Sequence, residues 1–342
     1  MKRNTTLDIL KGICLIFVVV THYPFSDETR LKFLFDYWIV MAIPLCMLVT
    51  GYVYSLSFQR KMITSLSDAY SQHGGIAEHL IRYTIPFLIA WIIELIAFRI
   101  LNVREPLSLL GYIKEFVCGG EGSGSYYYPV IVQMVFLFPL IYFCIKRRSV
   151  KGLVICCAIN VVFEFLQWAY GLNSDTYRLL SLRYILVVSF GCYFGLGGKL
   201  SKVASACLFV IGAVSIYLNT FRGISLFFIT SWRSTSFLTS LLAVPAFYYL
   251  IKLDVHCKPL ELLGKASYNI FLVQMVFFRF GVRHVISMFV SNPVIHFLLC
   301  LMVCLVGGVV FYFVETPITK ACIGAYKKWI SNRNVPQQNN AV

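Results

Sequence analysis

The sequence predicts an all-α protein, a polytopic transmembrane helical bundle of about ten spans with both termini in the cytoplasm. Of the 342 residues, 59% are hydrophobic and only 13% are charged, and the mean hydropathy is +0.76. Apolar runs long enough to cross a bilayer, about 20 residues each, recur along the whole chain. Lys and Arg gather in alternate connecting loops. Together these features predict a membrane protein and exclude a soluble globular domain.

The predicted spans follow one another without a separate soluble domain. Their approximate ranges are 7–24, 34–57, 80–102, 127–145, 151–170, 182–198, 203–220, 236–252, 267–290 and 294–314. We assign residues 1–318 to this transmembrane domain. Residues 319–342 form a predicted cytoplasmic tail, which we expect to be partly disordered because its end, SNRNVPQQNNAV, is polar.

The positive charges predict the orientation. The loop that contains Lys146, Arg147 and Arg148 is strongly basic, as is the segment from Lys320 to Arg333. Loops on the opposite side carry few Lys and Arg residues, and cytoplasmic loops are normally the basic ones. We therefore expect both termini and the even-numbered loops in the cytoplasm of a multi-pass plasma-membrane protein.

The net charge of +15 does not indicate nucleic-acid binding, because the positive residues are divided among these loops. The twelve cysteines lie mostly within apolar runs, as Cys14, Cys46 and Cys207 do, and no C-x-x-C pair occurs. We interpret them as small apolar side chains. The sequence therefore predicts neither a disulfide framework nor a metal site.

Two titratable residues occur in the first predicted span, LDILKGICLIFVVVTHYP. Lys11 and His22 are eleven residues apart, which is about three helical turns, so both side chains are expected on one helix face. Cationic and titratable groups inside a span often serve a function. The structural alternative is that Lys11 extends to the lipid headgroups and His22 ends the helix at the far interface.

A glycine-rich stretch precedes the fourth span. It reads CGGEGSGS and continues directly into Tyr126, Tyr127 and Tyr128. Tyrosine rings and hydroxyls suit contact with a sugar, and they suit an aromatic belt at the membrane interface equally well. Arg283 adds a cation toward the outer end of the ninth span.

The first span also carries a family resemblance. RNTTLDILKGICLIFVVVTH resembles the opening of the acyltransferase-3 family of polytopic membrane O-acyltransferases, whose first helix has a basic residue, ten spacers and a histidine. Here the pair is Lys11 and His22. The family commonly has Arg at the basic position, so Lys11 keeps the charge and loses the bidentate geometry.

Further family-like motifs follow in family order along nearly the whole chain. HLIRYTIPF resembles the third helix, in which Arg82 precedes Pro86, and the resemblance implies that Arg82 helps bind the acyl donor. YYYPVIVQ resembles the fourth helix, with Gln133 after the proline and without the family's usual Trp. LGKASYNIFLVQ resembles the ninth, with Gln274 in place of the usual His, and VETP resembles the terminal Glu-x-Pro step.

The resemblance implies transfer of an acyl group, acetyl by family analogy, from cytoplasmic acyl-CoA to a hydroxyl of a cell-envelope or exported glycan. It implies His22 as the catalytic residue and Lys11 and Arg82 as donor-binding residues. We assign Tyr127, Tyr128, Gln133 and Arg283 to the carbohydrate acceptor. Acetyl-CoA is the expected donor substrate, no cofactor is expected to be tightly bound, and the expected partners are the lipid bilayer and these two substrates. His22 would serve as a general base or form an acyl-histidine.

A secondary transporter or flippase is the alternative function. Several intramembrane ionisable residues suit a proton or solute path, namely Lys11, His22, Glu94, Arg99, Glu164 and Arg279. The chain shows neither an internal repeat nor a matching pair of Gly/Pro-broken spans in two halves. Dependence on a thioester donor distinguishes the two functions, because only the enzyme leaves an acyl group on its acceptor.

Overall fold

The computed structural model describes residues 5–225 and 228–334, and within them the secondary structure is entirely helical. The predicted all-α class is therefore confirmed for this part of the chain. Seven helical segments are long and apolar enough to cross a membrane. They are α1 (Thr5–His22), α3 (Phe35–Trp38) with α4 (Ala42–Arg60), α6 (Ile76–Ile100), α8 (Tyr127–Arg148), α9 (Val150–Ala169), α12 (Lys202–Ile216) with the π-helical η2 (Tyr217–Phe221), and α18 (Pro293–Asn334).

Shorter helices connect these segments or complete them. They are α2 (Asp27–Lys32), α5 (Leu66–Tyr70), α7 (Leu109–Val117), α10 (Ser174–Arg178), η1 (Ser181–Tyr184), α11 (Ile185–Gly195), η3 (Arg233–Thr235), α13 (Phe237–Ser240), α14 (Ala243–Leu250), α15 (Lys258–Lys265), α16 (Ser267–Arg279) and α17 (Val282–Phe289). Serine side chains begin several of them. Ser108 Oγ, for example, accepts the backbone N–H of Gly111 at 3.1 Å, which satisfies a free donor at the start of α7.

Three of the ten predicted spans are not single long helices in the structure. The sixth and eighth are short apolar segments, Ser181–Gly195 and Phe237–Leu250. The ninth, 267–290, divides into α16 and α17, which are bent by 71°. Gly281 lies at this bend with φ +62°, a left-handed conformation that ends an α-helix. Hydropathy counts apolar residues and does not detect such a break.

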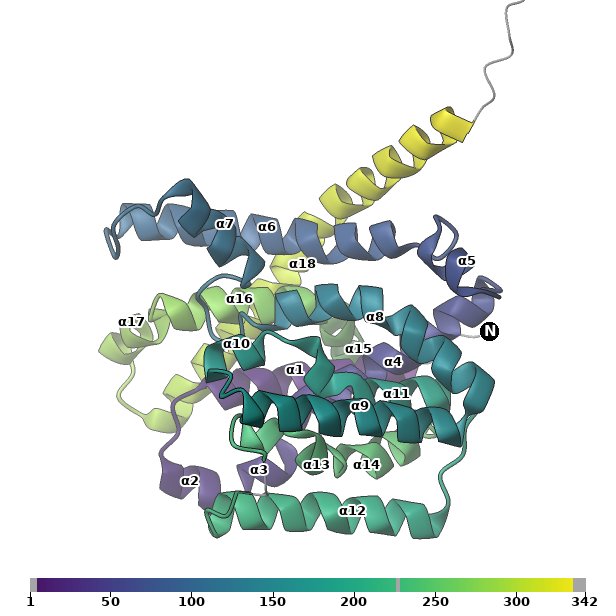
Figure 1. The fold of residues 1–342 in the computed structure, drawn as a ribbon. Coiled ribbons are helices and arrows are strands. Elements are labelled where there is room, and N and C mark those ends of the chain that lie inside the picture. The colour runs from purple at the N-terminus through teal and green to yellow at the C-terminus, as the bar shows by residue number, and fades with distance from the viewer. Residues whose placement is uncertain (1–4, 226–227, 335–342) are drawn as a thin grey trace, which may run out of the picture.

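The C-terminal segment also differs from its predicted form. Helix α18 continues past residue 318 to Asn334 and includes Pro317, so no structural boundary separates the predicted domain from the first part of the predicted tail. Its end extends beyond the other helices (Figure 1). Residues 335–342, where we expected disorder, lie outside the described residues.

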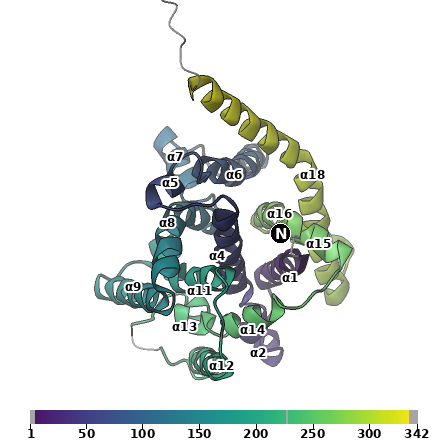
Figure 2. The same ribbon diagram turned by 90° about the vertical axis from the view of Figure 1, so that its right-hand side faces the viewer.

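Most of the long helices run side by side, with α6 along one edge of the bundle and α12 along the opposite edge, whereas α18 crosses the bundle obliquely (Figures 1 and 2). Within their most apolar stretches, α4 and α8 are 67% buried, whereas α6, α12 and α18 are 22% buried. The outer helices expose apolar side chains such as Ile96, Val210 and Val306. A ring of exposed apolar side chains is compatible with a helical membrane protein.

Glycines allow two helix pairs in the interior to approach closely. A Cβ atom on Gly51 of α4 would lie 2.1 Å from Val188 O of α11, and one on Gly191 would lie 2.1 Å from Leu48 O. The same arrangement joins α1 and α15, where a Cβ atom on Gly264 would lie 1.8 Å from Asp8 O. Small residues therefore bring these backbones into contact, as they do in helix pairs of membrane proteins.

Gly264→Ala tests the α1–α15 contact. The added methyl group overlaps a backbone carbonyl that side-chain rearrangement cannot move, so the free energy of unfolding should fall by about 1–3 kcal/mol. Gly324→Ala is the control, because a Cβ atom there has no neighbour within 4 Å. Thermal unfolding of both purified variants in detergent provides the measurement. Equal melting temperatures would contradict the close contact.

Candidate functional site

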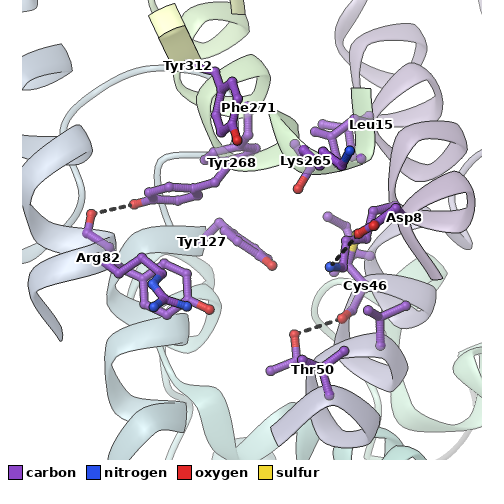
Figure 3. A pocket seen from close by; sticks show the side chains of 18 of the residues that line it. Asp8, Leu15, Cys46, Thr50, Arg82, Tyr127, Lys265, Tyr268, Phe271 and Tyr312 are labelled. Carbon is purple, nitrogen blue, oxygen red and sulfur yellow. Dashed lines mark hydrogen bonds and ion pairs between the residues drawn. The ribbon is translucent and has the colours of Figure 1, made fainter. Parts of the chain in front are cut away.

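A cavity of about 390 Å³ lies between α1, α4, α6, α8, α15, α16 and α18. One end carries charged and polar side chains, and the other is apolar and aromatic. The polar end includes Asp8, Lys11, His79, Arg82 and Lys265, and the apolar end includes Leu15, Val18, Ile43, Tyr127 and Phe271. Figure 3 shows Arg82 and Tyr127 on one side of this space, with Asp8 and Cys46 on the facing side.

The structure brings Lys11 and Arg82 to the same cavity, as donor binding would require. Lys11 Nζ lies 3.5 Å from Asp8 Oδ1, one turn earlier on α1. Arg82 is exposed on α6 and, in the described part of the chain, forms no ion pair with a carboxylate. Two cations from different helices therefore face one space. Their total charge is offset in part by Asp8.

Helix α1 also leads from this cavity toward His22. Asp8, Lys11, Leu15 and Val18 line the cavity at helical spacing, and His22 is the next position on the same face. The predicted common face of Lys11 and His22 is confirmed, because α1 is one continuous helix from Thr5 to His22. Their axial separation is roughly 16 Å.

Phe271 and Gly124 lie between the apolar end of the cavity and the His22 side chain. A Cβ atom on Gly124 would lie 3.0 Å from Phe271 Cε2 and 3.3 Å from His22 Nε2. The Tyr127 ring lies beside Phe271, with their centroids 5.0 Å apart. The aromatic pair Phe271 and Tyr127 therefore forms the apolar end of the cavity, and the His22 imidazole lies close behind Phe271. No hydrogen bond to this imidazole occurs within residues 5–225 and 228–334.

The glycine-rich loop (residues 118–125) packs across this end of the bundle. Gly119, Gly120 and Gly124 have positive φ, and a Cβ atom on Gly122 would lie 2.1 Å from Met275 Cγ. Ser123 O accepts a hydrogen bond from Gln274 Nε2 at 3.0 Å. Gln274 stands where the family resemblance has His, and here it holds the loop that contacts His22.

Charged residues hold the same loop in place. Glu121 accepts from Arg104 Nη1 at 2.6 Å and from Arg279 Nη2 at 2.6 Å. Arg104 also pairs with Glu115 of α7 at 2.7 Å, and its guanidinium lies 4.1 Å from the centroid of the Phe98 ring. This network joins α6, α7, the loop and α16. Within this network, Arg279 helps to position the loop.

Other predicted site residues lie in packed surroundings. The Tyr128 ring stacks on Phe87 with centroids 3.8 Å apart. Gln133 donates to Leu179 O at 2.7 Å and accepts the backbone N–H of Ser181 at 3.1 Å, so it connects α8 to the α10–η1 turn. Arg283 lies on α17 and is not among the residues that line the cavity. Of the four residues assigned to the acceptor, Tyr127 alone lines it.

Two acidic residues of the predicted spans, Glu164 and Glu94, are buried in different surroundings. Glu164 accepts a hydrogen bond from the Tyr177 hydroxyl at 2.7 Å, beside the fully buried Arg183, whose guanidinium carbon is 4.7 Å from the Tyr177 ring centroid. Glu94 is buried, and neither carboxylate oxygen has a hydrogen-bond partner within the described residues. Its Oε2 would lie 3.0 Å from a Cβ atom on Gly120.

Sequence reasoning missed most of the polar cavity wall. His79, Tyr83, Lys265 and Tyr312 line the cavity and were not assigned to the site. Two signals were present in the sequence: Lys265 lies within LGKASY, and His79, Arg82 and Tyr83 share one helix face. Tyr312 lies within an unbroken apolar run, so its sequence context offers no signal.

Comparisons with known proteins returned no match among family models, curated proteins or solved structures.

Glu121→Gln tests the ion-pair network of the loop. Losing two charge-assisted bonds that are partly exposed to solvent should cost about 1 kcal/mol of local stability. Amide hydrogen exchange at residues 118–125 should then quicken about fivefold. The control is Glu105→Gln, because Glu105 is exposed and has no ion pair within residues 5–225 and 228–334. Unchanged exchange in the Glu121 variant would show that glycine packing alone holds the loop.

Proposed function

We propose that this protein is a multi-pass membrane O-acyltransferase that moves a short acyl group, acetyl in the first instance, from cytoplasmic acyl-CoA to a hydroxyl of a cell-envelope or exported glycan. The observation that carries the proposal is the arrangement along α1. Lys11 and Arg82 face the polar end of the cavity, and His22 lies beyond its aromatic end on the same helix face. The family-like motifs of the sequence support the same function.

The proposed topology has both termini in the cytoplasm. It counts the seven long helices, the two shorter apolar segments and the bent α16–α17 pair as about ten spans. The polar end of the cavity then faces the cytoplasm, because it contains the first residues of α1 and α6. The glycine-rich loop and His22 lie toward the opposite surface. A donor from inside and an acceptor from outside would thus approach His22 from opposite directions.

The reaction assigned to the His22 site is transfer of an acyl group from a thioester to a hydroxyl. The acceptor hydroxyl oxygen forms the new ester bond with the acyl carbon, the carbon–sulfur bond breaks, and CoA leaves as the thiol. His22 takes the hydroxyl proton and passes it to the sulfur when it acts as a general base. In the covalent route, an imidazole nitrogen carries the acyl group between donor and acceptor. Only the covalent route attaches the radiolabelled acyl group to the protein before product forms, so detecting labelled protein distinguishes the two routes.

The aromatic pair separates the donor cavity from His22 in this conformation. Phe271 is 4% exposed and Tyr127 contacts it directly, so the thioester reaches His22 only when the Phe271 side chain turns aside. A small acyl group requires the least displacement. This geometry favours acetyl over longer chains as the transferred group.

His22→Ala should abolish transfer while leaving folded protein in the membrane. Purified protein in lipid receives radiolabelled acetyl-CoA and crude envelope glycans, and labelled glycan is counted. His284→Ala is the matched control, because His284 is exposed on α17 and should retain full activity. Turnover by the His22 variant at the normal rate would reject His22 as the catalytic residue. An absence of transfer in the wild type with every acceptor fraction would favour transport.

Arg82→Gln should raise the KM for acyl-CoA about tenfold or more, with kcat less affected, because a charge-assisted contact to a donor phosphate is lost. Arg99→Gln is the control on the same helix, since Arg99 is exposed near the opposite end of α6. Steady-state kinetics with varied acetyl-CoA measures both constants. A change in kcat alone would place Arg82 outside the donor-binding surface.

A further inference from the structure

A second cavity, of about 290 Å³, adjoins the first between α6, α16, α18 and the end of α15. The two share part of their lining, namely Arg82, Tyr83, Lys265, Tyr268 and Tyr312. Helix α18 contributes Glu315, Thr319 and Lys320 to the second cavity alone. A ligand longer than the first cavity could therefore extend past these shared residues toward α18.

The second cavity carries positive charge that the described part of the chain does not neutralise. Arg82, Lys265 and Lys320 line it, all three are exposed, and none forms an ion pair within residues 5–225 and 228–334. The acidic residue in its lining is Glu315. Its carboxylate accepts from Asn269 Nδ2 at 2.9 Å and from the Thr319 hydroxyl, so both oxygens are already bonded inside the protein. Three cations against one buried carboxylate favour an anionic ligand.

Aromatic side chains form the wall between the two cavities. The Tyr83 and Tyr268 rings lie 5.4 Å apart and nearly perpendicular, at 86°. The Tyr268 hydroxyl donates to Tyr83 O at 3.1 Å, which holds the ring in place. Half-buried aromatic faces beside cations suit a ligand that combines a flat ring with phosphate groups.

We propose that the second cavity binds the 3′-phosphorylated adenosine end of the acyl donor, with Lys320 and Lys265 contacting the phosphates. This inference rests on the proposed acyltransferase function and extends its donor site. The narrower pantetheine arm of the donor then passes the shared residues into the first cavity and carries the thioester toward Phe271. Lys320 discriminates a 3′-phosphorylated donor from one without that phosphate.

The experiment measures equilibrium binding of CoA and of 3′-dephospho-CoA to the full-length protein in phosphatidylcholine nanodiscs. The wild type should bind CoA at least about tenfold tighter than 3′-dephospho-CoA. Lys320→Gln should remove this preference and leave the affinity for 3′-dephospho-CoA unchanged. Lys265→Gln, which alters both cavities, should weaken both ligands.

Lys328→Gln is the matched control, because Lys328 is exposed on the same helix and lines neither cavity. It should retain the wild-type preference. Equal binding of the two ligands by the wild type would overturn the inference, as would equal weakening of both by Lys320→Gln. Acyl transfer is measured separately on the same samples. A preference for CoA over 3′-dephospho-CoA without acyl transfer would contradict the proposed acyltransferase function and still support the phosphate site.

A lipid headgroup is the other source of phosphate at this position. Nanodiscs that contain phosphatidylglycerol distinguish it from the nucleotide. If the cavity holds a headgroup, phosphatidylglycerol weakens CoA binding to the wild type but not to the Lys320 variant, and no 3′-phosphate preference appears in phosphatidylcholine. That result would overturn the nucleotide assignment.

Discussion

Close contact between the backbones of α1 and α15 positions the polar residues of the first helix. A Cβ atom on Gly12 would lie 2.5 Å from Leu260 O, and one on Gly264 would lie 1.8 Å from Asp8 O. Because the two helices meet without intervening side chains, Lys265 follows directly beside Asp8 and Lys11 at the polar end of the cavity. Helix α16 then begins two residues later and carries Tyr268 and Phe271 into the same space. Small residues at one contact thereby define three walls of the cavity.

The opposite end depends on a different constraint, the glycine-rich loop. Its glycines allow the backbone to lie against His22, Phe271, Met275 and Glu94, where side chains would collide. Glu121 then attaches the loop to Arg104 and Arg279. The loop lies beside His22, so in the proposed reaction an acceptor would approach the imidazole past it. Mobility there would link acceptor entry to the strength of the Glu121 ion pairs.

In the proposed reaction, the charged part and the reactive part of the donor would bind in different regions of the protein. Cations lie at the end where a phosphorylated donor would enter, and aromatic rings lie between them and His22. Such a separation keeps the charged part of a donor in one region while its thioester extends into another. Different helices would thus recognise the charged part and the reactive group of the donor, and α1 would contribute to both regions.

The sequence by itself determined the helical class, the positions of the apolar segments and the common face of Lys11 and His22, because hydrophobic length and the 3.6-residue period are local properties. Local patterns did not determine the bend at Gly281 or the continuation of α18 to Asn334, since both depend on backbone conformation and neighbouring helices. Only the tertiary structure decided which of the chosen side chains share a cavity. It placed Tyr127 there and gave Tyr128 and Gln133 other partners, because contacts between distant helices arise from packing in three dimensions.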